Sequence, residues 1–164
     1  MGREVGYFGM RYVVPLVVDW PGTVIAVNVG GAVIPGLLSL YLLFKNDMWI
    51  SGAIATAIVT AIVHMLAYPV EGVGIAVPVF VPPVVTALVA LLIAREHAAA
   101  LAYVAGSLGT LIGADLLNLD AVRGLGAPVA SIGGAGTFDG IFLTGILAVL
   151  LAGIASPSRP GLAR

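Results

Sequence analysis

Cysteine is absent from the 164 residues, and charged side chains make up only 9% of them. Without cysteine there are no disulfides, no thiolate metal ligands and no cysteine nucleophile. A soluble domain carries about a quarter charged residues, so this chain has too few charges to cover a water-facing surface. The net charge is −1 and there is no basic run, so nothing in the charge pattern predicts binding to nucleic acid. Two histidines without an H-E-x-x-H pattern do not predict a metal site, and no cofactor is expected.

Apolar residues, in contrast, make up 60% of the chain, and the mean hydropathy is +1.14. Such a composition indicates that lipid is the solvent around the protein. The length allows about five or six spans of roughly 20 residues each. We therefore predict an all-α fold, a polytopic transmembrane helix bundle, in a multi-pass protein of the cell membrane whose immediate partner is membrane lipid.

Hydropathy and helix breakers divide the chain into one transmembrane domain, residues 1–155, and a tail, residues 156–164, that we expect to be disordered. Residues 1–20 mix charges and aromatics with Pro15, and Pro21 follows directly, which predicts an interfacial or re-entrant segment. Glycines and prolines in residues 72–83 predict a broken segment, which membranes tolerate only against protein or a wet cavity. Basic residues are divided almost evenly between the two sides, so orientation stays open. The spans are expected near residues 23–44, 50–68, 76–94, 98–119 and 129–154.

The residues most suggestive of chemistry are two aspartates, Asp115 and Asp139, inside otherwise apolar spans. Each carboxylate in a membrane costs about 2.5–3.5 kcal/mol on insertion scales, so such acids tend to be functional. The loop between their spans is short, which predicts an antiparallel hairpin with the two aspartates facing each other. Two carboxylates held close share a proton, so that one can act as a general base on water while the other protonates a carbonyl.

Three functions remain open from these residues alone. The first is aspartyl chemistry, the hydrolysis of a transmembrane peptide. The second is translocation, in a small transporter or channel with Glu71, Asp115 and Asp139 along an ion or proton path; a homo-oligomer is then expected, because five spans hardly enclose a conduit. The third is a non-catalytic scaffold, in which Asp115 caps a helix or bonds to Asn118, and Asp139 pairs with Arg123 or a threonine.

The sequence Gly136-Thr-Phe-Asp139 resembles the Gly-x-Gly-Asp motif of the intramembrane aspartyl proteases, namely presenilin, signal peptide peptidase and prepilin peptidase. Phe138 stands where that motif has its second glycine. The resemblance implies that Asp115 is the first catalytic aspartate and Asp139 the second, and that the substrate is a membrane-embedded peptide. The stretches GSLGTLIGADLLN and GGAGTFDGIFLTG also resemble an uncharacterised prokaryotic multi-span family, over most of the chain, which implies no activity.

Small residues predict close helix packing around the two aspartates. Gly109 and Gly113 form one G-x-x-x-G step, and Gly136 and Gly140 form another. Gly113 and Asp115 lie roughly 200° apart on a helix, so this glycine pair should pack on a different neighbour from the one that Asp115 faces. The second pair flanks Asp139, where a backbone or a substrate can approach.

Other polar residues carry weaker predictions. His64 follows Thr56 and Thr60 at helical spacing, a strip that we expect to face the bundle interior. Its role is interhelical hydrogen bonding or, alternatively, a proton relay with Glu71, a residue that we expect at the membrane interface. Asn28, just before a glycine pair, predicts a helix break or a polar packing contact.

Overall fold

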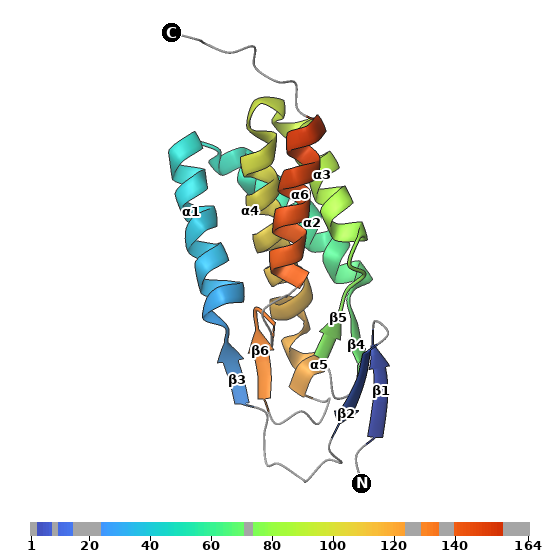
Figure 1. Cartoon of the computed structure of the whole chain (residues 1–164). Helices are drawn as coiled ribbons and strands as arrows, with labels where there is room; N and C mark the ends of the chain where they lie inside the picture. Colours follow the sequence, from blue (N-terminus) through green and yellow to red (C-terminus); the bar gives the residue numbers. More distant parts are fainter. Residues whose placement is uncertain are drawn as a thin grey trace.

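The structure, a computed structural model, describes residues 3–7, 10–14, 24–70, 74–123, 129–134 and 140–155. Within these ranges apolar helices form a bundle, and strands lie at one end of it (Figure 1). The long helices are α1 (Ile34–Asn46), α2 (Trp49–Leu66), α3 (Val81–Ile93), α4 (Ala98–Thr110) and α6 (Gly140–Ala155), and α5 (Leu119–Arg123) is a short one.

Two of these helices are lengthened by wider, π-helical turns. The π-helix η1 (Val29–Val33) leads directly into α1, and η3 (Leu111–Asp115) continues α4. A 3₁₀ turn, η4 (Leu116–Asn118), then joins η3 to α5. Another, η2 (Arg95–His97), links α3 to α4. The helical stretch that carries Asp115 is therefore much longer than α4 alone.

Three helical stretches are long and apolar enough to cross a membrane: Val29–Asn46, Trp49–Leu66 and Arg95–Ala121. Two shorter apolar helices, α3 and α6, complete the bundle. The predicted membrane helix bundle is thus confirmed.

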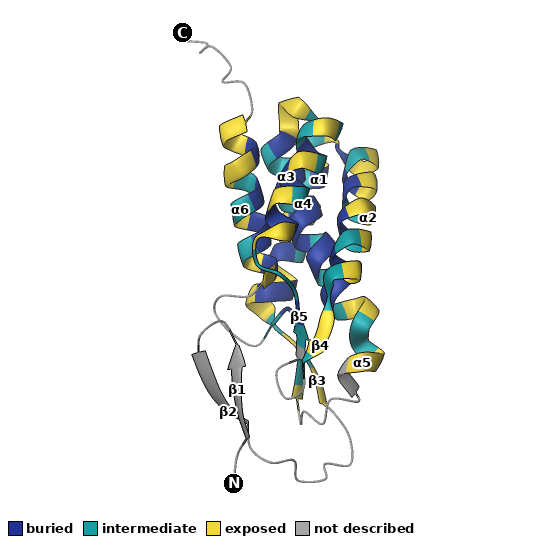
Figure 2. Cartoon of the chain, turned by 90° about the vertical axis from the view of Figure 1, so that its right-hand side faces the viewer, coloured by how far each residue is buried: buried dark blue, intermediate teal, exposed yellow. Residues whose placement is uncertain are grey.

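Side-chain burial in the bundle is the reverse of that in a soluble protein. The described core consists mostly of alanine with a few β-branched residues, whereas large apolar side chains such as Ile50, Met65 and Leu92 are exposed. Buried and exposed residues alternate along the helices (Figure 2). Small residues at helix contacts let backbones approach closely, and the outward leucines and isoleucines suit lipid. Helix α4 lies at the centre and contacts α1, α2, α3 and α6.

Three pairs of short strands accompany the helices. β1 (Arg3–Tyr7) pairs antiparallel with β2 (Met10–Val14), within the segment that we expected to be interfacial or re-entrant. β4 (Tyr68–Val70) pairs antiparallel with β5 (Gly74–Ala76). The third pair is parallel and joins distant parts of the chain: β3 (Val24–Val27) and β6 (Val129–Ile132), with Val24 opposite Val129.

These strands change the expected course of three spans. Residues 24–27, which we expected inside the 23–44 span, form β3, and the helical part begins at Val29. Residues 129–132, which we expected to open the last span, form β6, and α6 begins only at Gly140. Likewise β5 occupies the start of the expected 76–94 span, and α3 begins at Val81 with two buried prolines in its first turn. Proline fits there because the first-turn amides have no helical acceptor.

Candidate functional site

Two strand-to-helix units lie side by side at the strand-bearing end of the bundle. In the first, β3 runs through Asn28 into η1 and α1; in the second, β6 ends at Ile132, ahead of the chain that reaches α6 (Figure 1). Parallel pairing of β3 with β6 continues to the junction, where the Asn28 amide N donates to the Ile132 carbonyl O at 2.8 Å.

The side chain of Asn28 fastens the two units together. Its Oδ1 accepts from the amides of Gly30 (2.9 Å) and Gly31 (3.2 Å), which satisfies donors at the start of the helix. Its Nδ2 donates to the Gly134 carbonyl O at 2.8 Å, across the junction. The Ser131 hydroxyl donates to the same carbonyl at 2.8 Å. Asn28 is therefore both a helix cap and a tie between the units, which agrees with the predicted helix break.

Glycine is required where the two units touch. Gly133 and Gly134 have positive φ angles of 89° and 75°, a region that favours glycine. A Cβ added at Gly31 would collide with the carbonyl oxygen of Gly133, and one added at Gly133 would lie 2.7 Å from the Ala32 amide N. The two backbones thus meet without an intervening side chain.

Asp115 joins this junction from a third element. It is the last residue of η3 and is half-buried. Its Oδ2 accepts from the Gly133 amide N at 2.6 Å, a short bond of the kind that an ionised acceptor makes. The acid at the end of the α4 stretch is thus held against the chain that leads toward Asp139.

Behind Asp115, Asn118 and His64 bind the irregular end of the helix. The helical hydrogen-bond spacing changes where the π turn η3 gives way to the 3₁₀ turn η4, and side chains supply further donors to the carbonyls there. Asn118 Nδ2 donates to the carbonyls of Gly113 (2.9 Å) and Ala114 (3.0 Å). His64 Nδ1 lies 3.3 Å from the Gly113 oxygen and 3.3 Å from Asn118 Nδ2. The interhelical hydrogen bonding predicted for His64 is therefore observed.

The prediction that Gly109 and Gly113 pack on a different neighbour from the one that Asp115 faces is also confirmed. A Cβ at Gly109 would lie 2.6 Å from the Val59 side chain, and one at Gly113 would lie 2.6 Å from the Thr60 carbonyl, so both glycines pack on α2. Asp115 faces Gly133 instead. The two neighbours differ, as the helical spacing predicts.

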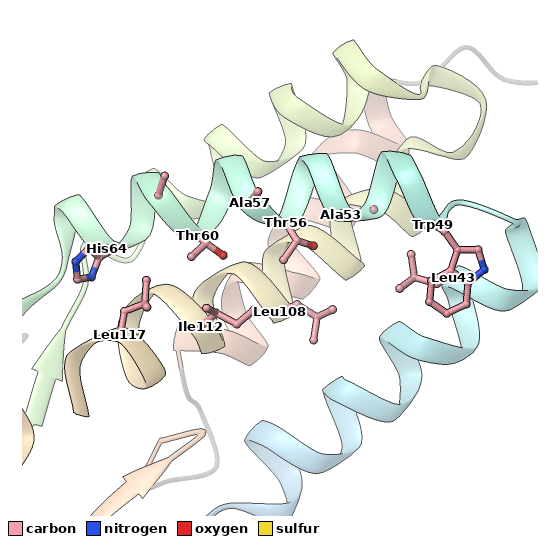
Figure 3. Close-up of a pocket in the computed structure, with 12 residues that line it drawn as sticks. Leu43, Trp49, Ala53, Thr56, Ala57, Thr60, His64, Leu108, Ile112 and Leu117 are labelled. Carbon is pink, nitrogen blue, oxygen red and sulfur yellow. The ribbon is translucent and has the colours of Figure 1, made fainter. Parts of the chain in front are cut away.

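The prediction that Thr56, Thr60 and His64 face the bundle interior holds for the two threonines, whose hydroxyl oxygens are buried, but not for His64. The buried face of α2 is formed by Gly52, Ala55, Val59 and Val63, and His64 is exposed. The strip lines an open groove of about 690 Å³ between α1, α2 and α4 (Figure 3). Helical spacing gave the strip correctly, but in lipid the polar face of a helix need not be its buried face. The groove is lined by Leu43, Trp49, Gly52, Ala53, Thr56, Ala57, Thr60, Ala61, His64, Leu108, Ile112 and Leu117.

With this geometry in view, comparison with known proteins defines the family. A family model described as "Protein of unknown function (DUF1614)" matches residues 1–151. The chain belongs to the DUF1614 family. No curated protein and no solved structure matches it. The predicted membership of an uncharacterised multi-span family is thereby confirmed.

Several candidate residues of this DUF1614 chain lie outside the described residues: Glu71, Gly136, Phe138 and Asp139. Gly140, the first residue of α6, is exposed, and no atom lies within 4 Å of a Cβ built there. There is open space around this glycine, and the predicted approach of a backbone or a substrate stays a prediction. Among the described residues no cluster of three or more acids, histidines or cysteines could hold a metal ion.

Sequence reasoning missed Ser131, Gly133 and Gly134 as members of the junction. A signal was present, because two apolar, β-prone tetrads, Val24–Val27 and Val129–Ile132, each precede a glycine pair. We had included both tetrads in helical spans because their hydropathy suits either structure. Both tetrads form strands, and the two strands pair with each other.

Proposed function

We propose that the chain is a multi-pass protein of the cell membrane, with its five long helices crossing the bilayer, and that it hydrolyses membrane-embedded peptides with a pair of aspartates. The observation that supports this most is the bond from the Gly133 amide to Asp115 Oδ2. It joins the helical stretch that carries one acid to the chain six residues before Asp139. Helix α6 begins directly after Asp139, so the bond ties Asp115 to the chain that leads into α6.

In the proposed reaction the two carboxylates share one proton. The ionised carboxylate takes a proton from water, and the resulting hydroxide oxygen attacks the peptide carbonyl carbon. The protonated carboxyl gives its proton to the carbonyl oxygen, forming a neutral tetrahedral species. Collapse of this species breaks the C–N bond, and the nitrogen leaves with a proton. A carboxylate has about four acceptor positions, so the bond from Gly133 is compatible with Asp115 acting on water.

Hydrolysis is tested with the Asp115→Asn and Asp139→Asn variants. Asparagine keeps an acceptor oxygen for the Gly133 amide but cannot take up a proton as a base. Asp120→Asn is the matched control, because Asp120 is an exposed acid on the next helical segment. Purified proteins in lipid vesicles are mixed with a panel of single-span peptides, and products are identified by mass spectrometry.

We expect cleavage by the wild-type protein and by Asp120→Asn, and none by the other two variants. A hydroxyethylene transition-state analogue carrying a photoreactive group should label the same active proteins. Cleavage that persists in Asp115→Asn or Asp139→Asn contradicts the proposal, as does complete absence of both cleavage and labelling in the wild type.

A second proposal is an ion or proton path through an oligomer, with Glu71, Asp115 and Asp139 along it. Its support is the strand-to-helix junction at Asn28, where η1 begins beside β6, since transporters bind substrates where a helix is interrupted. Flux of protons or sodium ions into vesicles should then fall in a Glu71→Gln variant. Vesicles that show no flux above protein-free vesicles exclude this path.

A further inference from the structure

The structure also bears on the depth at which Asp115 acts, an inference that rests on the proposed hydrolysis. The depth can be judged from two spans of known length, Val29–Asn46 and Trp49–Leu66, each 18 residues long. At 1.5 Å per residue each measures about 27 Å, close to the roughly 30 Å of a bilayer's hydrocarbon core. Each span therefore reaches from one boundary of the hydrocarbon to the other.

The turn between these spans marks one boundary. Lys45 and Asp47 lie there, and Phe44 packs edge-to-face on Trp49 with ring centroids 4.6 Å apart. Aromatic rings and charges are typical of the membrane–water interface. The start of the first span and the end of the second must then lie at the opposite boundary.

Asp115 is connected, through neighbouring residues, to that opposite end of both spans. Its partner Gly133 lies between Ile132 and Gly134, whose carbonyls bind Asn28, the residue directly before the first span. On the other side, Gly113 contacts His64, two residues before the second span ends. Two independent sets of contacts thus place Asp115 at the same level.

The strands give a third argument. Among the described residues, β3 and β6 form a sheet of two strands whose outer edges face no other described strand, and β4 and β5 form another such sheet. Open sheet edges do not occur in the hydrocarbon, where unpaired backbone groups find no water. The end of the bundle that carries these strands (Figure 1) must therefore lie at the interface.

We infer that Asp115 acts at the membrane–water boundary, on the side opposite the α1–α2 turn, and that the substrate is a membrane-anchored chain cut at the end of its span. Water, the co-substrate of hydrolysis, is available at this depth. The substrate's backbone is also accessible there, because the last four carbonyls of a helix lack helical partners and the chain beyond it is extended.

The depth of Asp115 is tested independently of cleavage, by introducing single cysteines into this chain, which has none of its own. Met65→Cys lies at the level of Asp115, Ala57→Cys in the middle of the same helix, and Ile50→Cys at its other end; all three positions are exposed. A membrane-impermeant sulfonated maleimide is added to spheroplasts and to inverted vesicles. We expect Met65→Cys to react from one side and Ile50→Cys from the other. Ala57→Cys should react about a hundredfold more slowly, since a thiolate in hydrocarbon is costly.

Protection of Met65→Cys equal to that of Ala57→Cys overturns the inferred depth, whether or not the protein cleaves peptides. The substrate is tested with peptides in which a helix-breaking cassette is moved from the middle of the span to its end. Cuts confined to the end of the span support the inference, and cuts at the middle overturn it while leaving the proposed hydrolysis intact. Absence of cleavage from every peptide, with Met65→Cys still reactive, counts against hydrolysis and leaves the depth of Asp115 supported.

Discussion

The contact between Gly31 and Gly133 makes a sharp prediction, because both sides of it are backbone. A Cβ on Gly31 would collide with the Gly133 carbonyl oxygen and would lie 2.8 Å from its carbonyl carbon. A flexible side chain could turn away, but these atoms belong to a chain fixed by β3–β6 pairing and by Asn28. Overpacking of this kind costs about 1–3 kcal/mol. Alanine recovers about 0.5–1 kcal/mol through its helix propensity. Gly31→Ala should therefore destabilise the protein by roughly 1–2 kcal/mol.

Gly36→Ala is the matched control on the same helix. No atom lies within 4 Å of a Cβ at Gly36, so only the propensity gain of about 0.5–1 kcal/mol remains. The two variants should thus shift stability in opposite directions. Reversible unfolding in mixed micelles, with SDS as denaturant and far-UV circular dichroism as readout, measures the difference. Equal stability of Gly31→Ala and Gly36→Ala would refute the close backbone contact and the junction built on it.

Three further predictions use the same unfolding measurement. Asn28→Ala removes a helix cap and the tie to β6 and should cost about 1–3 kcal/mol; an unchanged stability would show that the cap does not form. Gly113→Ala should cost about 1–3 kcal/mol because its Cβ meets a backbone carbonyl of α2, whereas Gly153→Ala, with open space around it, should be neutral or slightly stabilising. Asp115→Ala leaves the Gly133 amide without its acceptor and should cost about 1–3 kcal/mol, more than Asp115→Asn; equal losses would mean that the amide–carboxylate bond is unimportant for stability.

The helices could be predicted because lipid imposes a simple rule on sequence. A span must be apolar over its length and must satisfy its backbone internally, so α2 was expected at residues 50–68 and is observed at Trp49–Leu66. The separate faces of Gly113 and Asp115 also followed from helical geometry alone. These predictions depend on local periodicity, which a single sequence contains.

The junction depends on pairing between residues about a hundred positions apart, which periodicity does not report. Val129–Ile132 is apolar enough to form part of a span, and it is a strand because it pairs with Val24–Val27. Similarly, the helical spacing of His64 with Thr56 and Thr60 was predictable, but the exposure of His64 depends on how the neighbouring helices are arranged around the groove. The pairing of the two strands and the exposure of His64 both depend on the tertiary arrangement.

The structural and the proposed chemical roles of Asp115 have a common physical origin. A chain that turns from strand to helix leaves backbone donors without partners, and here two such turns lie together at Asn28 and Gly133. Asn28 satisfies the donors of the first unit, and the carboxylate of Asp115 accepts from the second. An acid that must be ionised to hold the Gly133 amide strongly is already in the state that a general base requires. At the boundary of the hydrocarbon, where water reaches it, that state costs less than in the bilayer centre. The same bond that closes the fold therefore prepares Asp115 for the hydrolysis that we propose.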